Sequence, residues 1–343
     1  MRIGLDVYTI DHRRLSAPAA LDFAREHSLD GLQFLDPTAI DAELRPASLA
    51  DFRRRADAMG LYVEVGLSCP NPVRQSRLAG RSIGVRDHAS ALARQVRAVS
   101  ALGCRHARAY VGDRHDRFRA DTLWKDQIAA TAAVIQALTP TLREQGVRIA
   151  LETHADLTVS ELLELVDRIG DVAAVTLDTG NLLMRLEDPV EAAERLAPWV
   201  VCTHLKDAVL AFTPRGLCWQ ARPIGGGALP FPDILAPLAK ARPELNLSIE
   251  MHPRTYDLPI FDRSWLAHFP DLRPASLAAV VAIAWECETG YQQGKLARPE
   301  AVEAIPWADR ELDWIARSVG YLRPVVRLLE RLNQTGGRAG GYS

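Results

Sequence analysis

Between residues 147 and 207 the chain passes three times from a short apolar segment into a polar one: VRIALETH (147–154), AVTLDTGN (174–181) and VVCTHLKD (200–207). The apolar halves are rich in Val, Ile, Leu and Ala, a composition typical of strands that are buried on both faces. About 26 residues separate each segment from the next, which leaves room for a helix and two loops. This stretch therefore predicts parallel strands joined by helical crossovers.

The same alternation continues on both sides of this stretch. Strand-like segments lie near residues 2–8, 31–35, 61–66, 105–111, 147–152, 173–178, 199–205 and 245–251, and amphipathic helical segments lie between them, for example at 85–102, 122–145, 158–169 and 188–197. Eight parallel strands with right-handed crossovers predict an α/β fold, a (β/α)8 TIM barrel. The alternative, a doubly wound open sheet, normally has a glycine-rich phosphate turn after its first strand, and none is present there.

The strand–helix pattern stops near residue 258. We therefore expect a TIM-barrel catalytic domain at residues 1–257, in which residues 207–230 form a long loop, and a mostly helical C-terminal extension at 258–343. The extension should contain helices near 275–292 and 308–333 and a flexible glycine-rich tail at 336–341. The pattern does not decide whether the extension covers the barrel mouth or packs on its side.

Composition narrows the choice of partners and location. The formal net charge is −2, and proteins that bind nucleic acid backbones usually have a basic excess, so no nucleic acid partner is expected. The most apolar run, Leu277 to Trp285, is too short to cross a bilayer, and the N-terminus has no targeting segment, so no membrane contact is expected. Five scattered cysteines form no disulfide framework, which favours a cytoplasmic protein.

Four of the last strands end in a side chain that can bind a metal ion: Glu152, Asp178, His204 and Glu250. Alternation along each strand points all four into the barrel at the same height, at the end where barrel active sites form. Unpaired, such groups would each cost several kcal/mol, a cost that one divalent cation removes. Three carboxylates and one imidazole suit Mn²⁺, Mg²⁺ or Co²⁺. The alternative is that each is an ordinary polar residue paired with a lysine or arginine.

A second layer of polar residues lies nearer the predicted mouth. His154, Lys206 and His252 stand two positions beyond three of the candidate ligands, where they are expected to meet a substrate rather than a metal. The lysine suits a carboxylate, a phosphate or an oxyanion leaving group. A histidine exchanges protons near neutral pH, so either one suits acid–base work.

Together these motifs resemble the xylose isomerase-like superfamily of sugar isomerases and epimerases. The resemblance covers about residues 1–255 and rests on Glu152, DTGN (178–181), HLKD (204–207), the glycine loop RPIGGG (222–227) and Glu250. It implies that Glu152, Asp178, His204 and Glu250 hold one divalent ion, Mn²⁺ above all, and that Glu152 and Glu250 are the catalytic acid and base. It also implies that Asn181 and Arg222 join His154, Lys206 and His252 in binding substrate.

The sequence departs from that pattern at two positions. Many members have histidine in place of Asn181, and ketose epimerases have a substrate-binding glutamate where this chain has Thr158. These differences weaken the case for a simple ketose 3-epimerase. The long extension is also similar to the larger subunit of bacterial C-glycoside deglycosidases, which work with a small β-rich partner. Both a homo-oligomer and a hetero-oligomer with a small partner subunit therefore stay open.

The expected function is a divalent-metal-dependent isomerase or epimerase of a small sugar or sugar derivative. It would remove the proton α to a carbonyl through a metal-stabilised enediolate. Loss of a β-leaving group from the same intermediate would instead make a lyase or dehydratase, such as a C-glycoside deglycosidase. A non-catalytic sugar-binding barrel is a second alternative. An endonuclease for abasic DNA on this fold is disfavoured, because it needs extra histidines on the early strands.

Overall fold

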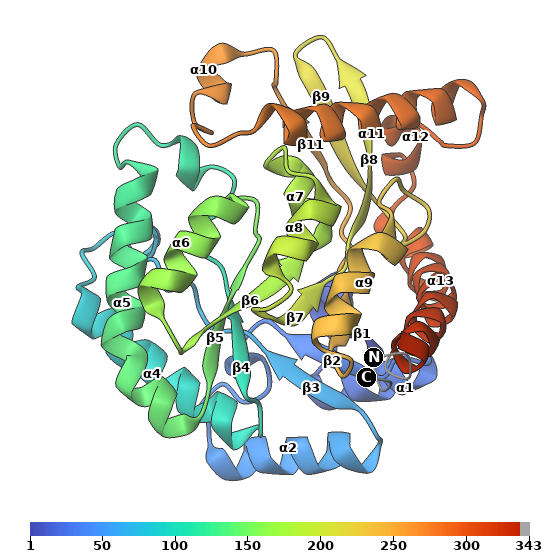
Figure 1. Cartoon of the computed structure of the whole chain (residues 1–343). Helices are drawn as coiled ribbons and strands as arrows, with labels where there is room; N and C mark the ends of the chain where they lie inside the picture. The colour runs from blue at the N-terminus through green and yellow to red at the C-terminus, as the bar shows by residue number, and fades with distance from the viewer. Residues whose placement is uncertain (337–343) are drawn as a thin grey trace, which may run out of the picture.

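The computed structural model describes residues 1–336, so most of the predicted flexible tail, from residue 337, lies outside the described residues. Its centre is a barrel of parallel strands (Figure 1): β1 Arg2–Asp6, β2 Gly31–Phe34, β3 Tyr62–Val65, β4 His106–Ala109, β5 Arg148–Glu152, β6 Ala173–Asp178, β7 Val200–His204 and β10 Asn246–Ile249. The strands form two four-stranded sheets, which the bridges Gly66–Arg108 and Leu205–Ile249 join into one ring. The predicted TIM barrel is confirmed.

Helices surround this ring in the expected alternation. Those that follow the strands are α1 Ala17–Glu26, α2 Pro46–Ala58, α4 Val85–Ala101, α5 Trp124–Gln145, α6 Val159–Ile169, α8 Pro189–Leu196 and α9 Phe231–Ala241. Shorter elements at the loops are the 3₁₀ helices η1 Val7–Arg13, η2 Pro37–Ala39 and η3 Asp116–Phe118, and the helices α3 Pro72–Ala79 and α7 Thr179–Met184. Local sequence explains the starts: Thr158 and Glu161 form a capping box before α6, and the Asp188 side chain caps α8.

The barrel interior follows the predicted alternation of side chains. Ala150, Ala174 and Cys202 belong to a small apolar cluster that is separate from the main core. Their strand neighbours Ile149 and Val175 belong to the main core instead. One face of each strand therefore points inward, and that face carries the candidate ligands at its end.

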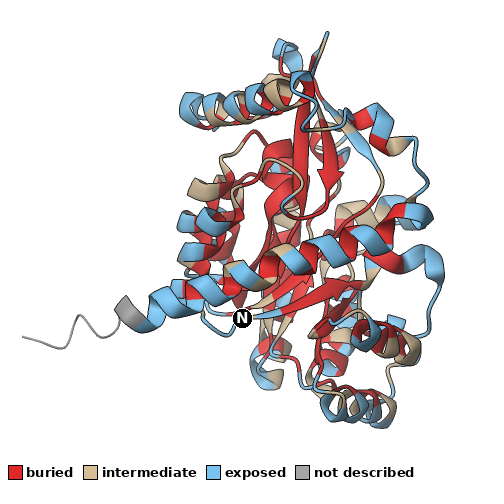
Figure 2. Cartoon of the chain, turned by 90° about the vertical axis from the view of Figure 1, so that its right-hand side faces the viewer, coloured by how far each residue is buried: buried red, intermediate tan, exposed pale blue. Residues whose placement is uncertain are grey.

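The eighth barrel helix comes from the C-terminal segment. Helix α13 (Trp307–Gly336) packs against α9 and β1, and its Ile315 and Leu322 belong to the main core (Figures 1 and 2). Arg323 pairs with Asp30 at 2.6 Å after α1, so the helix closes the gap between α9 and α1. A barrel that ended at residue 257 would lack this helix. We therefore propose that α13 belongs to the barrel unit.

A second layer covers the carboxyl end of the barrel. Strands β8 (Asp207–Thr213), β9 (Gly216–Arg222) and β11 (Thr255–Leu258) form an antiparallel sheet, so the prediction of a long loop at 207–230 was wrong. The hairpin is buried on both faces because it packs between the barrel and α11 (Pro274–Gln292), and its sequence therefore lacks a clear alternation of apolar and polar residues. Helices α10 (Arg263–Leu266) and α12 (Pro299–Glu303) complete the layer. The extension thus both covers the mouth and packs on the side.

Helix α11 is the most apolar of the long helices, and its outer face exposes Trp285. Within residues 1–336, however, no helix has both the length and the hydropathy needed to cross a bilayer.

Candidate active site

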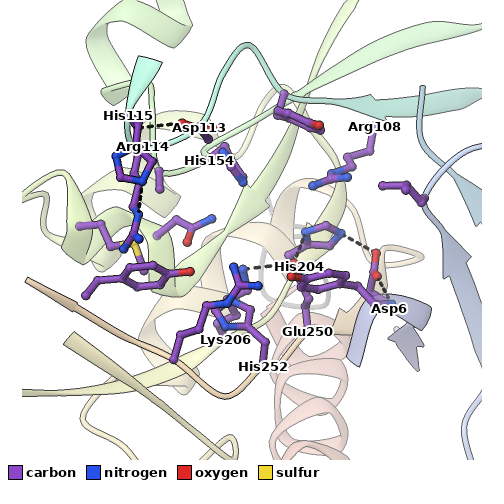
Figure 3. Close-up of a pocket in the computed structure, with 18 of the residues that line it drawn as sticks. Asp6, Arg108, Asp113, Arg114, His115, His154, His204, Lys206, Glu250 and His252 are labelled. Carbon is purple, nitrogen blue, oxygen red and sulfur yellow. Dashed lines mark hydrogen bonds and ion pairs between the residues drawn. The ribbon is translucent and has the colours of Figure 1, made fainter. Parts of the chain in front are cut away.

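A cavity of about 340 Å³ opens at the carboxyl end of the barrel, beneath the antiparallel layer. Six residues singled out from the sequence line it: His154, Asn181, His204, Lys206, Glu250 and His252. Figure 3 shows His204, Lys206 and Glu250 side by side at its floor. Glu152 and Asp178 lie under that floor and are fully buried. Four strand ends from different parts of the chain therefore meet at one place.

The four candidate ligands form a compact cluster. Each residue offers one ligand atom, and these atoms all lie within 4.8 Å of one another. His204 Nδ1 is 3.1 Å from Glu152 Oε1 and 2.6 Å from Glu250 Oε2. Two ligands on opposite sides of an ion, each with a bond of ~2.2 Å, are about 4.4 Å apart. The spacing and the oxygen-rich donor set therefore fit one divalent cation of the Mn²⁺ or Mg²⁺ type.

The imidazole of His204 is oriented by two residues that the sequence did not single out. Its Nε2 lies 2.8 Å from Gln33 Oε1 and 3.1 Å from Asp6 Oδ2, both of which are acceptors. Nε2 therefore carries a hydrogen, and loss of the second hydrogen from Nδ1 would leave its lone pair facing the two glutamates. Such partners commonly fix the tautomer of metal-binding histidines. For Gln33, the sequence signal that could have identified it is a polar glutamine inside the otherwise apolar strand segment GLQF.

Two cationic side chains neutralise part of the cluster. Arg108 Nε donates to Glu152 Oε2 at 2.6 Å. Lys206 Nζ lies 2.8 Å from Asp178 Oδ2 and 3.2 Å from Glu250 Oε2, so this lysine contacts the predicted ligands as well as the cavity. Each of the three carboxylate ligands thus has a basic partner, as the alternative for this sequence expects, but one lysine serves two of them. If Asp6 is counted with the three ligand carboxylates, four acidic groups face two permanently cationic ones, Arg108 and Lys206.

Burial and charge act on the pKa of each member in opposite directions. Burial alone would lower the pKa of His204, but the carboxylates of Glu250 and Glu152 outweigh it and raise that pKa well above its ordinary value. Burial opposes ionisation of Glu250, yet Lys206 and His204 hold its pKa well below the usual range. Burial raises the pKa of Asp178 to about 7 in spite of Lys206. Mutually shifted groups of this kind are typical of functional sites.

Two further histidines of the cavity, His154 and His252, are uncharged near neutral pH. Burial lowers the pKa of His154 to about 4, and its Nδ1 donates to Gly112 O at 2.9 Å. Burial likewise lowers the pKa of His252 to about 3. Among residues 1–336, the Nδ1 atom of His252 is buried without a hydrogen-bond partner. Both rings therefore present neutral polar edges to the cavity.

The glycine loop holds the hairpin rather than a ligand. Asp207 accepts hydrogen bonds from the backbone N–H groups of Ala208, Gly225, Gly227 and Leu229, at 2.8 to 3.1 Å. A Cβ on Gly227 would lie 2.2 Å from Asp207 Oδ1, so only glycine fits there. Arg222 ends β9 outside the cavity, and its guanidinium donates to Ala297 O. The structure therefore does not place this predicted substrate-binding residue at the site.

A second group of ligand-type residues lies deeper in the barrel. Glu64, His106 and Cys202 could also hold an ion by their spacing. Glu64 Oε1 lies 3.2 Å from His106 Nε2 and accepts from Asn246 Nδ2 at 2.8 Å, while Cys202 Sγ donates to Glu64 Oε2 at 3.4 Å. Both oxygens of this single carboxylate thus have donors. The group is complete without a cation.

Comparison with known proteins identifies the family. A family model described as xylose isomerase-like TIM barrel matches residues 21–268, which is more than half of the chain. The chain belongs to the xylose isomerase-like TIM-barrel family. An uncharacterised protein of Escherichia coli, YihM, is 30% identical over 116 residues, which are 33% of this chain and 35% of that protein. The match therefore spans about a third of the length of that relative.

Solved structures of the xylose isomerase-like fold superpose on most of the chain. A D-psicose 3-epimerase, solved in the presence of D-fructose, is 15% identical, with a TM-score of 0.56 over 87% of this chain and 100% of that one. A 3-keto-D-glucoside 4-epimerase of E. coli, YcjR, is 13% identical, with a TM-score of 0.54 over 79% of this chain and 100% of that one. At such identity these likenesses support the fold alone.

The two departures from the xylose isomerase-like pattern have structural reasons. Asn181 donates through Nδ2 to Asp178 Oδ2 at 2.7 Å and through its backbone N–H to Asp178 Oδ1 at 3.0 Å, so it orients a candidate ligand at the cavity wall. Thr158 caps α6 and donates through its hydroxyl to Asp271 Oδ2 at 2.8 Å. Thr158 is thus committed to helix capping and to a contact with the extension.

Proposed function

We propose that the protein is a divalent-metal-dependent isomerase or epimerase of a small sugar or sugar derivative. The observation that carries the proposal is the buried Glu152–Asp178–His204–Glu250 cluster at the floor of a cavity, where carboxylates outnumber cationic partners. Family membership and the epimerase activity named for two structural neighbours support it. A TIM barrel alone does not specify a reaction, so the site carries the argument.

The four residues would hold the ion through one carboxylate oxygen each of Glu152, Asp178 and Glu250 and through Nδ1 of His204. Mn²⁺ is the ion we favour, with Mg²⁺ or Co²⁺ as alternatives. A bound ion would supply Lewis-acid polarisation of the substrate carbonyl.

The protein's own groups prepare the site for proton transfer. Glu250 is 6% exposed and reaches the cavity surface, so we assign it the removal of the proton α to the carbonyl. We assign Glu152 the transfer on the other face of the sugar; because it lies under the floor and is held by Arg108, this transfer requires the ion pair to open. Delivery of the proton to the opposite face of the same carbon gives an epimer. Delivery to the neighbouring carbon gives an isomer.

Lys206 and Arg108 have a further effect on this chemistry. Their positive charges lie within hydrogen-bond distance of the two acids that would move the proton, Arg108 at Glu152 and Lys206 at Glu250. Fixed positive charge in a site sheltered from water stabilises developing negative charge more than water does. These side chains therefore favour the anionic state that follows proton removal.

The test is solvent exchange at the α carbon. The Mn²⁺-loaded protein is incubated in D₂O with D-fructose, D-psicose and a 3-keto-glucoside, and deuterium uptake and products are followed by NMR. We expect uptake into at least one sugar, its loss after chelation and its return with Mn²⁺. Full activity after exhaustive chelation contradicts metal dependence. Binding without exchange would favour a non-catalytic barrel, and release of an aglycone would favour a lyase.

A further inference from the structure

Two arginines on the rim of the cavity lack an acidic partner. Arg114 lies in the loop after β4 and Arg254 directly precedes β11, and both side chains are exposed. The guanidinium of Arg114 lies over the ring of Tyr256, 4.5 Å from its centroid, and Nε donates to His115 Nε2. Arg254 lies beside the phenols of the same Tyr256 and of Tyr8. Within residues 1–336 neither guanidinium forms an ion pair with a carboxylate.

The other cationic side chains at the cavity are compensated. Each has acidic partners: Arg74 pairs with Asp113 and Asp116, Arg108 with Glu152, and Lys206 with Asp178 and Glu250. At the floor, four carboxylates face two cations, so a divalent ion would bring that layer to neutrality. The rim has no excess of carboxylates, and the positive charges of Arg114 and Arg254 remain uncompensated there. Figure 3 shows Arg114 and His115 on the side of the cavity away from Asp6 and Arg108.

An unpartnered polar atom lies between floor and rim. His252 is 8% exposed, lines the cavity, and has no hydrogen-bond partner at Nδ1 within the described chain. Its ring centroid lies 6.1 Å from that of Tyr256, the residue that both rim arginines contact. Buried polar atoms are nearly always paired in the working state of a protein, so an atom of the substrate is expected to complete this one.

We propose that the substrate is an anionic sugar whose carboxylate or phosphate group lies at the rim and is bound by Arg114 and Arg254. The proposal rests on the isomerase or epimerase function proposed above. The buried floor takes the carbonyl end of the sugar, and the exposed rim takes the charged end. A guanidinium presents a planar set of donors that matches either oxyanion, and two of them on neighbouring loops give a geometry that a neutral hydroxyl cannot use as well.

The test compares three forms of one ketose that differ only at C6. D-fructose carries a hydroxyl there, D-fructuronate a carboxylate and D-fructose 6-phosphate a phosphate. Each is titrated by calorimetry into the full-length Mn²⁺-loaded protein and assayed for α-proton exchange in D₂O. The variants are Arg114→Gln, Arg254→Gln and the double variant. The control is Arg54→Gln, an exposed arginine of α2 that pairs with Asp51 away from the cavity.

We expect at least one anionic form to bind about tenfold more tightly than D-fructose, since two exposed arginine–oxyanion pairs together can supply the roughly 1.4 kcal/mol that this ratio requires. The double variant should reduce this ratio to about one, the control should keep it, and added salt should lower it. The preferred anion distinguishes a sugar acid from a sugar phosphate. If neither anion binds more tightly than D-fructose, or if the double variant keeps the preference, the proposal is wrong.

The two proposals fail in different ways. An arginine-dependent preference for an anion, without proton exchange in any sugar, supports the rim site and contradicts the isomerase function. Exchange of D-fructose with the same KM as the anionic forms contradicts the rim site and leaves the isomerase function standing.

Discussion

The barrel contains two groups of metal-ligand residues, and only one of them is short of donors. In the lower group, His106, Asn246 and Cys202 provide hydrogen-bond donors for both oxygens of the single carboxylate, Glu64. In the upper group, four carboxylates share Arg108, Lys206 and one imidazole. The residue types are alike and neighbouring strands contribute both. Ligand-type residues therefore indicate a metal only where the chain itself leaves their charge uncompensated.

The largest expected effect comes from removing a ligand of the upper group. His204→Ala and Asp178→Asn should lose the bound ion, and turnover should fall by about 10³-fold or more, because electrostatic stabilisation of the reacting sugar goes with it. Elemental analysis of protein purified without chelator gives the metal content. Glu64→Gln is the matched control and should keep one equivalent. Loss of the ion from the control alone would place the metal in the lower group.

Exchange of a carboxylate for an amide should separate binding from proton transfer. Glu250→Gln and Glu152→Gln should reduce α-proton exchange by about 10²–10⁴-fold, because a glutamine cannot accept the proton. Metal content is measured in parallel, so that loss of the ion is not mistaken for loss of the base. A variant that holds its metal and exchanges at the wild-type rate identifies that glutamate as a ligand only.

The residues behind His204 should affect the ion without touching it. Gln33→Leu and Asp6→Asn free the imidazole to turn or to change tautomer, and each should weaken metal binding by about 10-fold, within the range known for such partners. Titration with Mn²⁺ gives the dissociation constants, and excess Mn²⁺ should rescue activity. Asp36→Asn, which alters the cap of the short helix η2, is the control. Unchanged metal affinity in both variants would show that His204 needs no orientation.

The neutral histidines distinguish isomerisation from elimination. If they only bind substrate, His154→Ala and His252→Ala should raise KM severalfold and leave kcat nearly unchanged. A lyase needs an acid for the leaving group. In that case one of these variants should lose kcat and still exchange the α-proton with D₂O. Steady-state kinetics and exchange measured on the same samples decide between the two.

The smallest functional effect is expected in the lower group. Glu64→Gln leaves a donor unmatched in the barrel interior and should lower the free energy of unfolding by about 1–3 kcal/mol. Because this group is hydrogen-bonded without a cation, kcat should stay within about twofold of wild type. Denaturant unfolding and kinetics measure the two quantities. A large fall in kcat with unchanged stability would contradict the contrast between the groups.

The strands and the candidate ligands follow from local pattern. All eight barrel strands lie within about two residues of their predicted bounds, because short apolar segments separated by amphipathic helices leave few other arrangements. The same alternation placed Glu152, Asp178, His204 and Glu250 in one cluster. The periodicity within each strand is enough to predict its bounds and the side chains that point into the barrel.

Contacts between distant segments could not be found in this way. Arg222 is the first residue of the glycine loop motif, as the family pattern requires. Its guanidinium nevertheless binds the carbonyl of Ala297, which is far along the chain. Lys206 alternates as expected, yet its ammonium turns back to Asp178 because that carboxylate is buried and needs a cation. Helix α13 was predicted as a helix, but nothing in its periodicity says that it completes the barrel. The homo-oligomer and the small partner subunit both stay predictions.

The late position of α13 has a consequence for synthesis on the ribosome. About sixty residues, those of the mouth layer, separate the end of β10 from the start of α13, the helix that packs against β1 and α9. At ~5–20 residues per second the nascent chain spends on the order of 3–12 s with its barrel strands complete and one flank uncovered. During that interval β1 and α9 expose the apolar side chains that α13 later covers, so the chain is most exposed to aggregation and to chaperones just before it finishes. A stop codon before residue 307 would make that state permanent.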